Sequence, residues 1–204
     1  MTKIKICGLF RPEDADYVNE ALPDYIGFVF AQSRRRVTPA QAAALKERLD
    51  ARIKAVGVFV DAAADEVVAL VQAGVIDLIQ LHGNEDAAYI ERLRPTTDVP
   101  VVKAVRVRSA EQVLAAQSLP CDYLLLDAYH PEKQGGSGER FDWTLLPALE
   151  KPYFLAGGID PGNIRLALKT GPYAIDVSSG AETDGLKDKQ KIIELVNIVR
   201  SEDR

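Results

Sequence analysis

The chain has 204 residues, of which 47% are hydrophobic and 27% are charged. These values are ordinary for a globular protein, and a chain of this length can bury a core without disulfide or metal staples. The formal net charge of −5 argues against nucleic acid or an anionic membrane as a partner, because both favour basic surfaces. A small anionic substrate remains possible, since binding it needs only local positive charge.

The cysteines and the N-terminus indicate a cytoplasmic protein with free thiols. Cys7 and Cys121 are too few for a disulfide framework, and neither lies in a CxxC pair, so no metal site is expected. The N-terminal residues lack the apolar stretch of a signal peptide. No segment approaches the roughly 20 apolar residues that span a bilayer.

Short apolar runs alternate with longer amphipathic segments along the chain. The runs predict strands over Lys3–Cys7, Tyr25–Phe30, Ala55–Val60, Leu78–Leu81, Val101–Val105, Tyr123–Leu126, Tyr153–Ala156 and Ala174–Val177. The segments between them predict helices over Pro12–Ala21, Ala40–Leu49, Asp65–Ala73, Glu85–Leu93, Ala110–Ala116, Leu145–Leu149, Gly162–Lys169 and Lys189–Ile198. Thr38 followed by Pro39 is typical of a helix start, and Gly74 of a helix end.

Eight strand–helix units predict an α/β fold, a single (β/α)8 TIM barrel, with residues 1–204 as one catalytic domain. Nearly continuous apolar strands indicate burial on both faces, as in a parallel sheet. Regular alternation of the two element types indicates an α/β protein. A doubly wound open sheet is the alternative architecture. Eight units without a long interruption favour closure into a barrel.

The active site of a (β/α)8 barrel lies at the C-terminal ends of its strands. Polar residues directly after each strand are therefore the candidates. They are Cys7-Gly8, Ser33 with Arg34, Arg35 and Arg36, Gln80 to Gly83, Asp127, Gly157-Gly158, and Ser178 to Gly180. Cys121 precedes a strand instead, so we expect it to be a small buried hydrophobic residue at the opposite face.

Two glycine pairs predict a phosphate site. Gly157-Gly158 follows the seventh strand and Ser179-Gly180 follows the eighth. Phosphate sites in these barrels commonly form at these two strand ends, where glycine lets backbone N–H groups approach an anion. Tight strand–helix turns are the alternative role for these glycines.

The arginine run suggests a second anionic group on the substrate, because arginine can bind a carboxylate through two parallel hydrogen bonds. For at least two of the three arginines a solvated surface position is the simpler interpretation. Asp127 follows an apolar run, and partial desolvation would favour its protonated form, as a general acid needs. It could instead brace a loop, and His82 could be a substrate donor or a structural histidine.

A series of motifs runs in order along essentially the whole chain. It comprises Lys5–Gly8 with Arg11–Ala15, Gly27–Phe30, Ser33–Pro39, Gly57–Val60, Gln80–Gly83, Leu125–Asp127, Gly135–Gly138, Phe141–Trp143, Leu155–Gly158, Asp176–Glu182 and Gly185–Asp188. Each motif alone is weak, but together they resemble the phosphoribosylanthranilate isomerase family of tryptophan biosynthesis. Phe10 departs from the family pattern, which more often has a small hydroxyl residue there.

The resemblance implies a (β/α)8 barrel and an Amadori rearrangement without cofactor or metal. The family converts N-(5′-phosphoribosyl)anthranilate to 1-(2-carboxyphenylamino)-1-deoxyribulose 5-phosphate, an aldose–ketose isomerisation. The implied partner is this small-molecule substrate, and the chain is expected to be a monomer or a homodimer. The substrate carries a phosphate and an aromatic carboxylate, the two anionic groups suggested by the glycine pairs and the arginines.

The resemblance also implies the roles of the site residues. Cys7 is the general base and Asp127 the general acid. Arg35 matches the family arginine that binds the anthranilate carboxylate, while Arg34 and Arg36 fall at variable positions. The resemblance also implies an inward acid at Asp176 and a loop with Gly136 that covers the substrate. His82, from its place at the end of the fourth strand, is a further candidate for binding the substrate. The phosphate is expected to bind at Gly157, Gly158, Ser179 and Gly180.

The thiol of Cys7 needs a bias toward thiolate to act near neutrality, because an ordinary thiol has a pKa of about 8.5. We hypothesise that the iminium formed from the bound substrate supplies that bias.

Two other functions remain as alternatives. The histidine-pathway enzyme performs an Amadori step on a bulkier substrate with two aspartates, one of which ends the first strand where this chain has Cys7. A non-catalytic phosphate-binding scaffold is the second alternative, and it predicts loss of the acid or the base, both of which are present.

Overall fold

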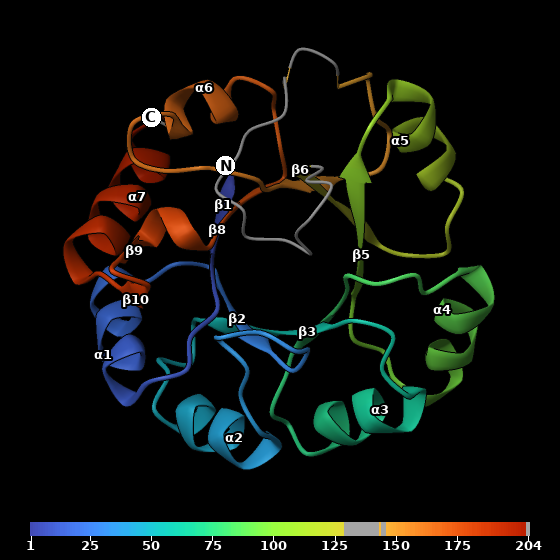
Figure 1. The fold of residues 1–204 in the computed structure, drawn as a ribbon, viewed down its shortest axis with the longest axis horizontal. Coiled ribbons are helices and arrows are strands. Elements are labelled where there is room, and N and C mark those ends of the chain that lie inside the picture. Colours follow the sequence, from blue (N-terminus) through green and yellow to red (C-terminus); the bar gives the residue numbers. More distant parts are fainter. Residues whose placement is uncertain (129–142, 144–145, 203–204) are drawn as a thin grey trace.

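Eight parallel strands form a closed barrel in the structure, a computed structural model that describes residues 1–128, 143 and 146–202. Neighbouring strands pair in chain order, and β8 closes against β1 (Figure 1). The strands are β1 (Lys3–Cys7), β2 (Tyr25–Val29), β3 (Lys54–Phe59), β4 (Leu78–Leu81), β5 (Val101–Val107), β6 (Tyr123–Ala128), β7 (Tyr153–Leu155) and β8 (Ala174–Val177). The predicted TIM barrel is confirmed, and the open sheet is excluded.

A ring of helices surrounds the barrel (Figure 1). These are α1 (Pro12–Ala21), α2 (Pro39–Glu47), α3 (Ala64–Gln72), α4 (Ala87–Leu93), α5 (Ala110–Ala116), α6 (Ile164–Leu168) and α7 (Lys189–Glu202). A 3-10 turn η1 (Arg94–Thr96) follows α4, and η3 (Ser179–Ala181) precedes a hairpin of β9 (Glu182–Thr183) and β10 (Leu186–Lys187). The side chains of Thr38, Asp86 and Ser109 accept hydrogen bonds from the backbone three residues on, which sets the starts of α2, α4 and α5.

Seven of the eight predicted helices are observed, with bounds that match the prediction or differ by one to four residues. Residues 146–149, most of the helix expected over Leu145–Leu149, are not helical. Pro147 explains this, because proline lacks an N–H and disfavours helical backbone in the residue before it. The fourth helix begins at Ala87 and not at Glu85, because Asp86 is its N-cap and accepts a hydrogen bond from the N–H of Tyr89. The Glu85 carboxylate turns inward to the ammonium of Lys103, 2.8 Å away.

The interior of the barrel is apolar at the strand starts and polar at the strand ends. Side chains two residues apart on a strand point to the same side. Leu125 and Asp127 therefore share the inner side of β6, and Ala174 and Asp176 that of β8. An apolar cluster fills the interior at the strand starts with Val56, Leu78, Val102, Leu125, Phe154 and Ala174. The polar groups thus lie above a packed apolar floor.

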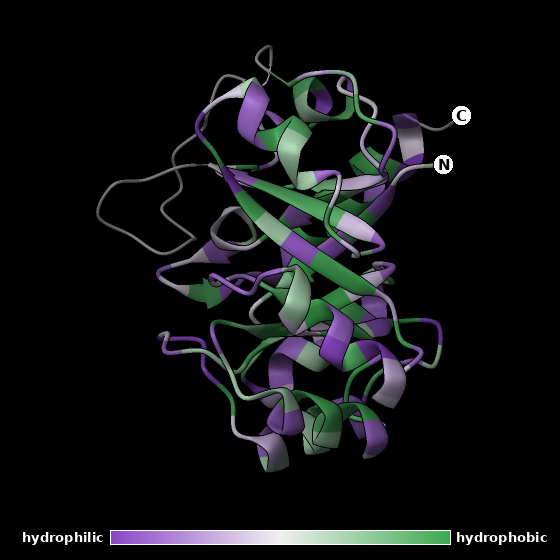
Figure 2. Cartoon of the chain, turned by 90° about the vertical axis from the view of Figure 1, so that its right-hand side faces the viewer, coloured by the Kyte–Doolittle hydropathy of each residue, from purple (hydrophilic) through white to green (hydrophobic). Residues whose placement is uncertain are grey.

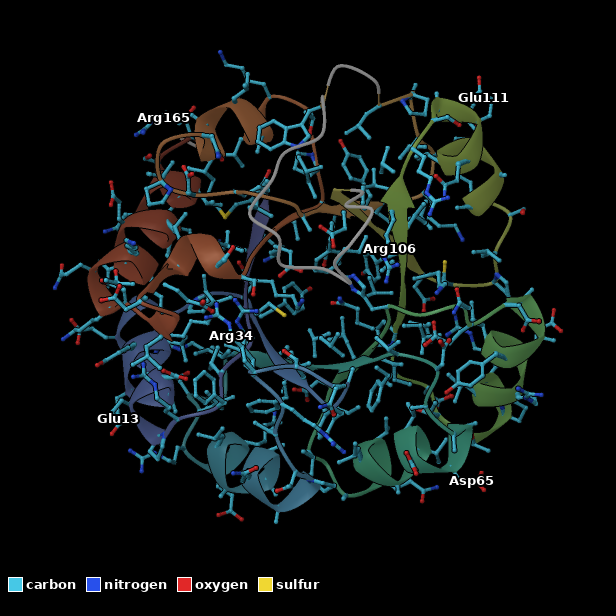
Figure 3. The ribbon with its side chains drawn as sticks, in the orientation of Figure 1. Glu13, Arg34, Asp65, Arg106, Glu111 and Arg165 are labelled. Atoms are coloured by element: carbon cyan, nitrogen blue, oxygen red, sulfur yellow. The ribbon has the colours of Figure 1, made fainter. Side chains whose placement is uncertain are left out.

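A second apolar layer lies between the strands and the helices, and includes Ile6 of β1 and Ile192 of α7. The outer helices carry both hydrophobic and hydrophilic residues (Figure 2). Glu13, Asp65 and Glu111 lie at the periphery of the molecule, on α1, α3 and α5 (Figure 3). Within the described residues, no helix combines the length and apolar character needed to cross a membrane.

Candidate active site

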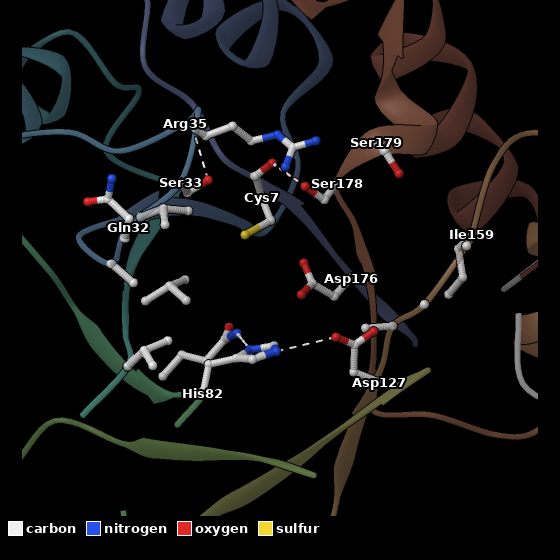
Figure 4. A pocket seen from close by; sticks show the side chains of 18 residues that line it. Cys7, Gln32, Ser33, Arg35, His82, Asp127, Ile159, Asp176, Ser178 and Ser179 are labelled. Carbon is white, nitrogen blue, oxygen red and sulfur yellow. Dashed lines mark hydrogen bonds and ion pairs between the residues drawn. The ribbon is translucent and has the colours of Figure 1, made fainter. Parts of the chain in front are cut away.

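A pocket opens at the C-terminal ends of the strands (Figure 4). Most of the predicted site residues line it: Cys7, Arg35, His82, Asp127, Gly157, Gly158, Asp176 and Ser179. Gly180 lies next to this lining. Gly136 lies outside the described residues. The barrel therefore gathers side chains from both ends of the chain around one cavity.

Cys7 ends β1 with its thiol in this pocket. Gly27 of β2 makes room for the sulfur, since a Cβ atom at position 27 would lie 2.7 Å from Cys7 Sγ. Burial raises the pKa of the Cys7 thiol above its ordinary value; Lys5 and Lys187 oppose this rise, and Asp176 adds to it. Burial thus favours the protonated thiol near neutrality, and positive charge near the sulfur opposes this effect.

This environment predicts the pH dependence of Cys7 alkylation. In a Cys121→Ala background, where Cys7 is the remaining cysteine, the iodoacetamide rate should reach half its maximum above about pH 8.5, the ordinary thiol value. A bound cationic substrate analogue should shift this midpoint downward. A midpoint at or below the ordinary value in the unliganded protein would contradict the assigned effect of burial.

Asp127 lies across the pocket from Cys7, near His82 (Figure 4). His82 Nε2 is 3.3 Å from Asp127 Oδ2. Asp127 belongs to β6 itself, because this strand runs two residues beyond its predicted end at Leu126, and Asp127 pairs in register with Arg106. The carboxyl group is thus carried by a rigid strand and not by a loop.

Asp176 of β8 pairs with Lys5 inside the barrel. The two residues are register partners, and Lys5 Nζ donates to Asp176 Oδ2 at 3.0 Å. The other oxygen, Asp176 Oδ1, is buried without a hydrogen-bond partner, as is His82 Nε2. A buried polar atom without a partner is costly, so these two atoms mark places where a polar ligand is favoured.

Arg35 is held by Glu182, which follows η3. Arg35 Nε and Nη2 donate to the two carboxylate oxygens of Glu182 at 2.7 and 2.9 Å. Lys187 Nζ and Arg34 Nη2 also donate to this carboxylate. Burial alone would raise the pKa of Glu182, but Arg35 and Lys187 outweigh it, and the pKa lies below its usual value.

The three arginines have different environments. The Arg35 side chain is 10% exposed and lines the pocket, whereas that of Arg34 is 56% exposed. Arg36 is exposed and lines a separate groove between α2 and α3. Gly8, with φ of 88°, makes room for Arg35, since a Cβ atom there would lie 2.4 Å from Arg35 Cδ. Of the three, Arg35 is thus positioned to reach a ligand in the pocket.

The two predicted phosphate loops lie against each other. Gly157 and Gly158 have φ of 89° and 65° after β7. A Cβ atom at Gly180 would lie 1.9 Å from the carbonyl oxygen of Ile159, so only glycine allows η3 to approach the β7 loop. The backbone of both loops therefore reaches one edge of the pocket, together with Ser179.

Four buried polar residues of this site received no role from the sequence: Lys5, Gln80, Glu182 and Lys187. Gln80 was among the candidates at the strand ends, and Lys5 was detectable because it stands two residues before Cys7 and so faces the same side of β1. The sequence carries no comparable signal for Glu182. Within the described residues, no group of three or more His, Cys, Asp or Glu side chains is placed to hold a metal ion.

A family model and several relatives of known identity indicate one family. Residues 4–198 match the family model of N-(5′-phosphoribosyl)anthranilate isomerase. The enzyme of that name from Endomicrobium trichonymphae is 49% identical, covering 98% of this chain and 100% of the relative. The crystal structure of phosphoribosyl anthranilate isomerase from Thermus thermophilus superposes with a TM-score of 0.87 at 34% identity, covering 98% of this chain and 99% of that one.

A further solved structure shows phosphoribosyl anthranilate isomerase in complex with reduced 1-(o-carboxyphenylamino)-1-deoxyribulose 5-phosphate. It has a TM-score of 0.82 at 28% identity, covering 98% of this chain and all of the other. Motifs, barrel, pocket and relatives thus agree along nearly the full length of the sequence. The chain belongs to the N-(5′-phosphoribosyl)anthranilate isomerase family.

Proposed function

We propose that this chain converts N-(5′-phosphoribosyl)anthranilate to 1-(2-carboxyphenylamino)-1-deoxyribulose 5-phosphate, with Cys7 as general base and Asp127 as general acid. The observation that carries this proposal is the placement of a thiol and a carboxyl group on different sides of one rim pocket. A rearrangement that adds one proton and removes another needs two such groups. The family membership supports the substrate and a cytoplasmic place in tryptophan biosynthesis.

The reaction proceeds in three steps. Asp127 protonates the furanose ring oxygen, the bond from C1′ to that oxygen breaks, and the nitrogen lone pair forms a protonated Schiff base. Cys7, as thiolate, then removes the C2′ proton, and the electron pair of that C–H bond neutralises the iminium to give an enamine. Tautomerisation of this enol-amine yields the aminoketose. The iminium charge favours the thiolate that burial disfavours.

The remaining pocket groups bind the substrate in this proposal. Backbone N–H groups of Gly157, Gly158, Ser179 and Gly180 hold the phosphate. The orphaned Asp176 Oδ1 accepts a hydrogen bond from a ribose hydroxyl, and His82 lies beside the acid. Gly136, outside the described residues, belongs to the loop proposed to cover the substrate. Arg35 binds the anthranilate carboxylate through Nη1, because its other edge faces Glu182.

The decay of anthranilate fluorescence with freshly generated phosphoribosylanthranilate tests this function. Purified protein should consume the substrate rapidly and without added metal or cofactor. Absence of turnover would exclude the assignment and make the histidine-pathway aminoaldose the next compound to test. Binding of the substrate without turnover would favour a phosphate-binding scaffold.

Arg35→Ala should chiefly raise KM. A charge-assisted hydrogen bond contributes about 1.5–3 kcal/mol, so a rise of roughly ten- to a hundredfold is expected. Arg36→Ala is the matched control, because it removes the same charge from an exposed position outside the pocket. Arg34→Ala is a second control at an exposed position, although Arg34 shares the Glu182 carboxylate with Arg35. Steady-state kinetics would contradict the assignment of Arg35 if either control raised KM more.

A further inference from the structure

Lys5 lies wholly buried in the barrel, two residues before Cys7, with 0% of its surface exposed. Its ammonium group donates to Asp176 Oδ2 at 3.0 Å and to Gln80 Oε1 at 2.8 Å. An ammonium group can only donate hydrogen bonds, so it must face the oxygen of the Gln80 amide and not the nitrogen. Lys5 therefore determines which way this amide points.

The other end of the same amide contacts His82. Gln80 Nε2 lies 2.9 Å from His82 Nδ1. An amide NH2 group can only donate, so Nδ1 must be the acceptor, and the neutral imidazole carries its proton on Nε2. The orientation of one side chain thus determines the tautomer of the next.

His82 Nε2 is the atom that faces the proposed acid, at 3.3 Å from Asp127 Oδ2 (Figure 4). The N–H is not aligned with this oxygen, which leaves Nε2 buried without a hydrogen-bond partner. Catalytic hydrogen bonds are often long or poorly aligned before substrate binds and then tighten. The unsatisfied N–H is thus available to Asp127 during the reaction.

We infer that Gln80, held by Lys5, is a positioning residue that assigns His82 its Nε2–H tautomer and so presents an N–H donor to Asp127. This inference rests on the proposed function, in which Asp127 gives its proton to the ring oxygen. A donor at Oδ2 stabilises the carboxylate that remains. In the other tautomer, a lone pair on Nε2 would face that carboxylate and oppose its formation.

The positive charge of Lys5 keeps the Gln80 amide in this orientation. Burial alone would lower the pKa of Lys5, but Asp176 and Cys7 more than offset this, so its pKa lies above the ordinary value. Lys5 therefore stays an ammonium ion throughout the neutral range and never becomes an acceptor. The same ammonium ion opposes the rise in the pKa of Cys7. The charge of Lys5 therefore acts on the thiol of Cys7 as well as on the orientation of the Gln80 amide.

Nitrogen-15 NMR of the imidazole rings tests the tautomer in the unliganded protein. The chain has two histidines, and the His82 signals are identified by their loss in His82→Gln. In the wild type near pH 8, we expect His82 to be protonated on Nε2 and unprotonated on Nδ1. A ring protonated on Nδ1 in the wild type would overturn the inference.

Gln80→Glu is the decisive variant, because it keeps the size of the side chain and offers His82 only oxygen. Nδ1 must then be protonated, which gives either the opposite tautomer or an imidazolium. The opposite tautomer places a lone pair of Nε2 beside Asp127, and the imidazolium places a positive charge there that favours the carboxylate over the acid that must give its proton. We expect a loss of about tenfold or more in kcat, part of the range typical of acid–base catalysis, with KM and the melting temperature nearly unchanged. A retained kcat, or a loss of kcat without protonation of Nδ1, would refute the inference.

Lys5→Met tests the first link of the chain. Release of the Gln80 amide should produce both His82 tautomers in the spectrum, and an unchanged single tautomer would remove Lys5 from the inference. If this variant fails to fold because Asp176 loses its buried partner, Gln80→Glu still decides. The NMR readout needs no substrate, so it fails or succeeds independently of the proposed reaction.

Discussion

Asp127→Asn should lower kcat by about 10²- to 10⁴-fold, the contribution typical of a general acid. The amide keeps the size and shape of the carboxyl group but has no proton that it can transfer to the ring oxygen. The substitution leaves the substrate contacts proposed for the phosphate loops and Arg35 in place, so KM should move by no more than a few-fold. Fluorescence-monitored steady-state kinetics measures both constants.

Asp65→Asn is the matched control for this experiment. It makes the same chemical change on the outer face of α3, where Asp65 is exposed and far from the pocket (Figure 3). We expect wild-type kcat and KM from this control. If Asp127→Asn also retained kcat, another group would have to supply the proton, and His82 would be the next candidate because it lies beside the same oxygen.

Cys7→Ala should reduce kcat to the level measured without enzyme or close to it, because no other group is proposed to remove the C2′ proton. Cys7→Ser should be nearly as inactive, since a hydroxyl of similar shape is a far weaker acid than a thiol and supplies no anion near neutrality. The expected loss is again about 10²-fold at least. Substrate affinity should persist in both variants.

Cys121→Ala is the control for the removal of a thiol. Cys121 is also buried, but it lies before β6, at the opposite end of the barrel from the pocket. This variant should retain kcat, with at most a modest loss of stability. Substantial activity in Cys7→Ser would show that Cys7 acts by hydrogen bonding and not as the base; the search would then move to Asp176.

The arrangement of the pocket suggests why a thiol is tolerable as the base. A carboxylate at position 7 would stand beside Asp176 and would repel it in a buried site. The thiol stays neutral there, and its pKa is raised by burial until the substrate itself becomes cationic. In the proposed mechanism, Cys7 would therefore act as a base only after ring opening, which would order the two proton transfers.

Much of this protein was predictable from sequence alone. Alternating apolar runs and amphipathic segments determined the barrel, because strand and helix periodicities are local properties of the chain. The barrel then placed strand ends at one rim, which selected Cys7 and Asp127 and separated Cys7 from Cys121. The local pattern also gave a wrong prediction at residues 145–149, where an apolar segment that contains a proline resembled a short helix.

Only the tertiary structure decided how these groups are held. Glu182 meets Arg35 across a sequence separation of 147 residues, and Lys5 meets Asp176 across a separation of 171. Such contacts depend on strand register and on packing between distant segments, and neither leaves a local pattern. The same is true of the chain from Lys5 through Gln80 to His82. Sequence periodicity could place each of these side chains inside the barrel, but hydrogen-bond direction, and with it the histidine tautomer, follows only from which atoms meet there.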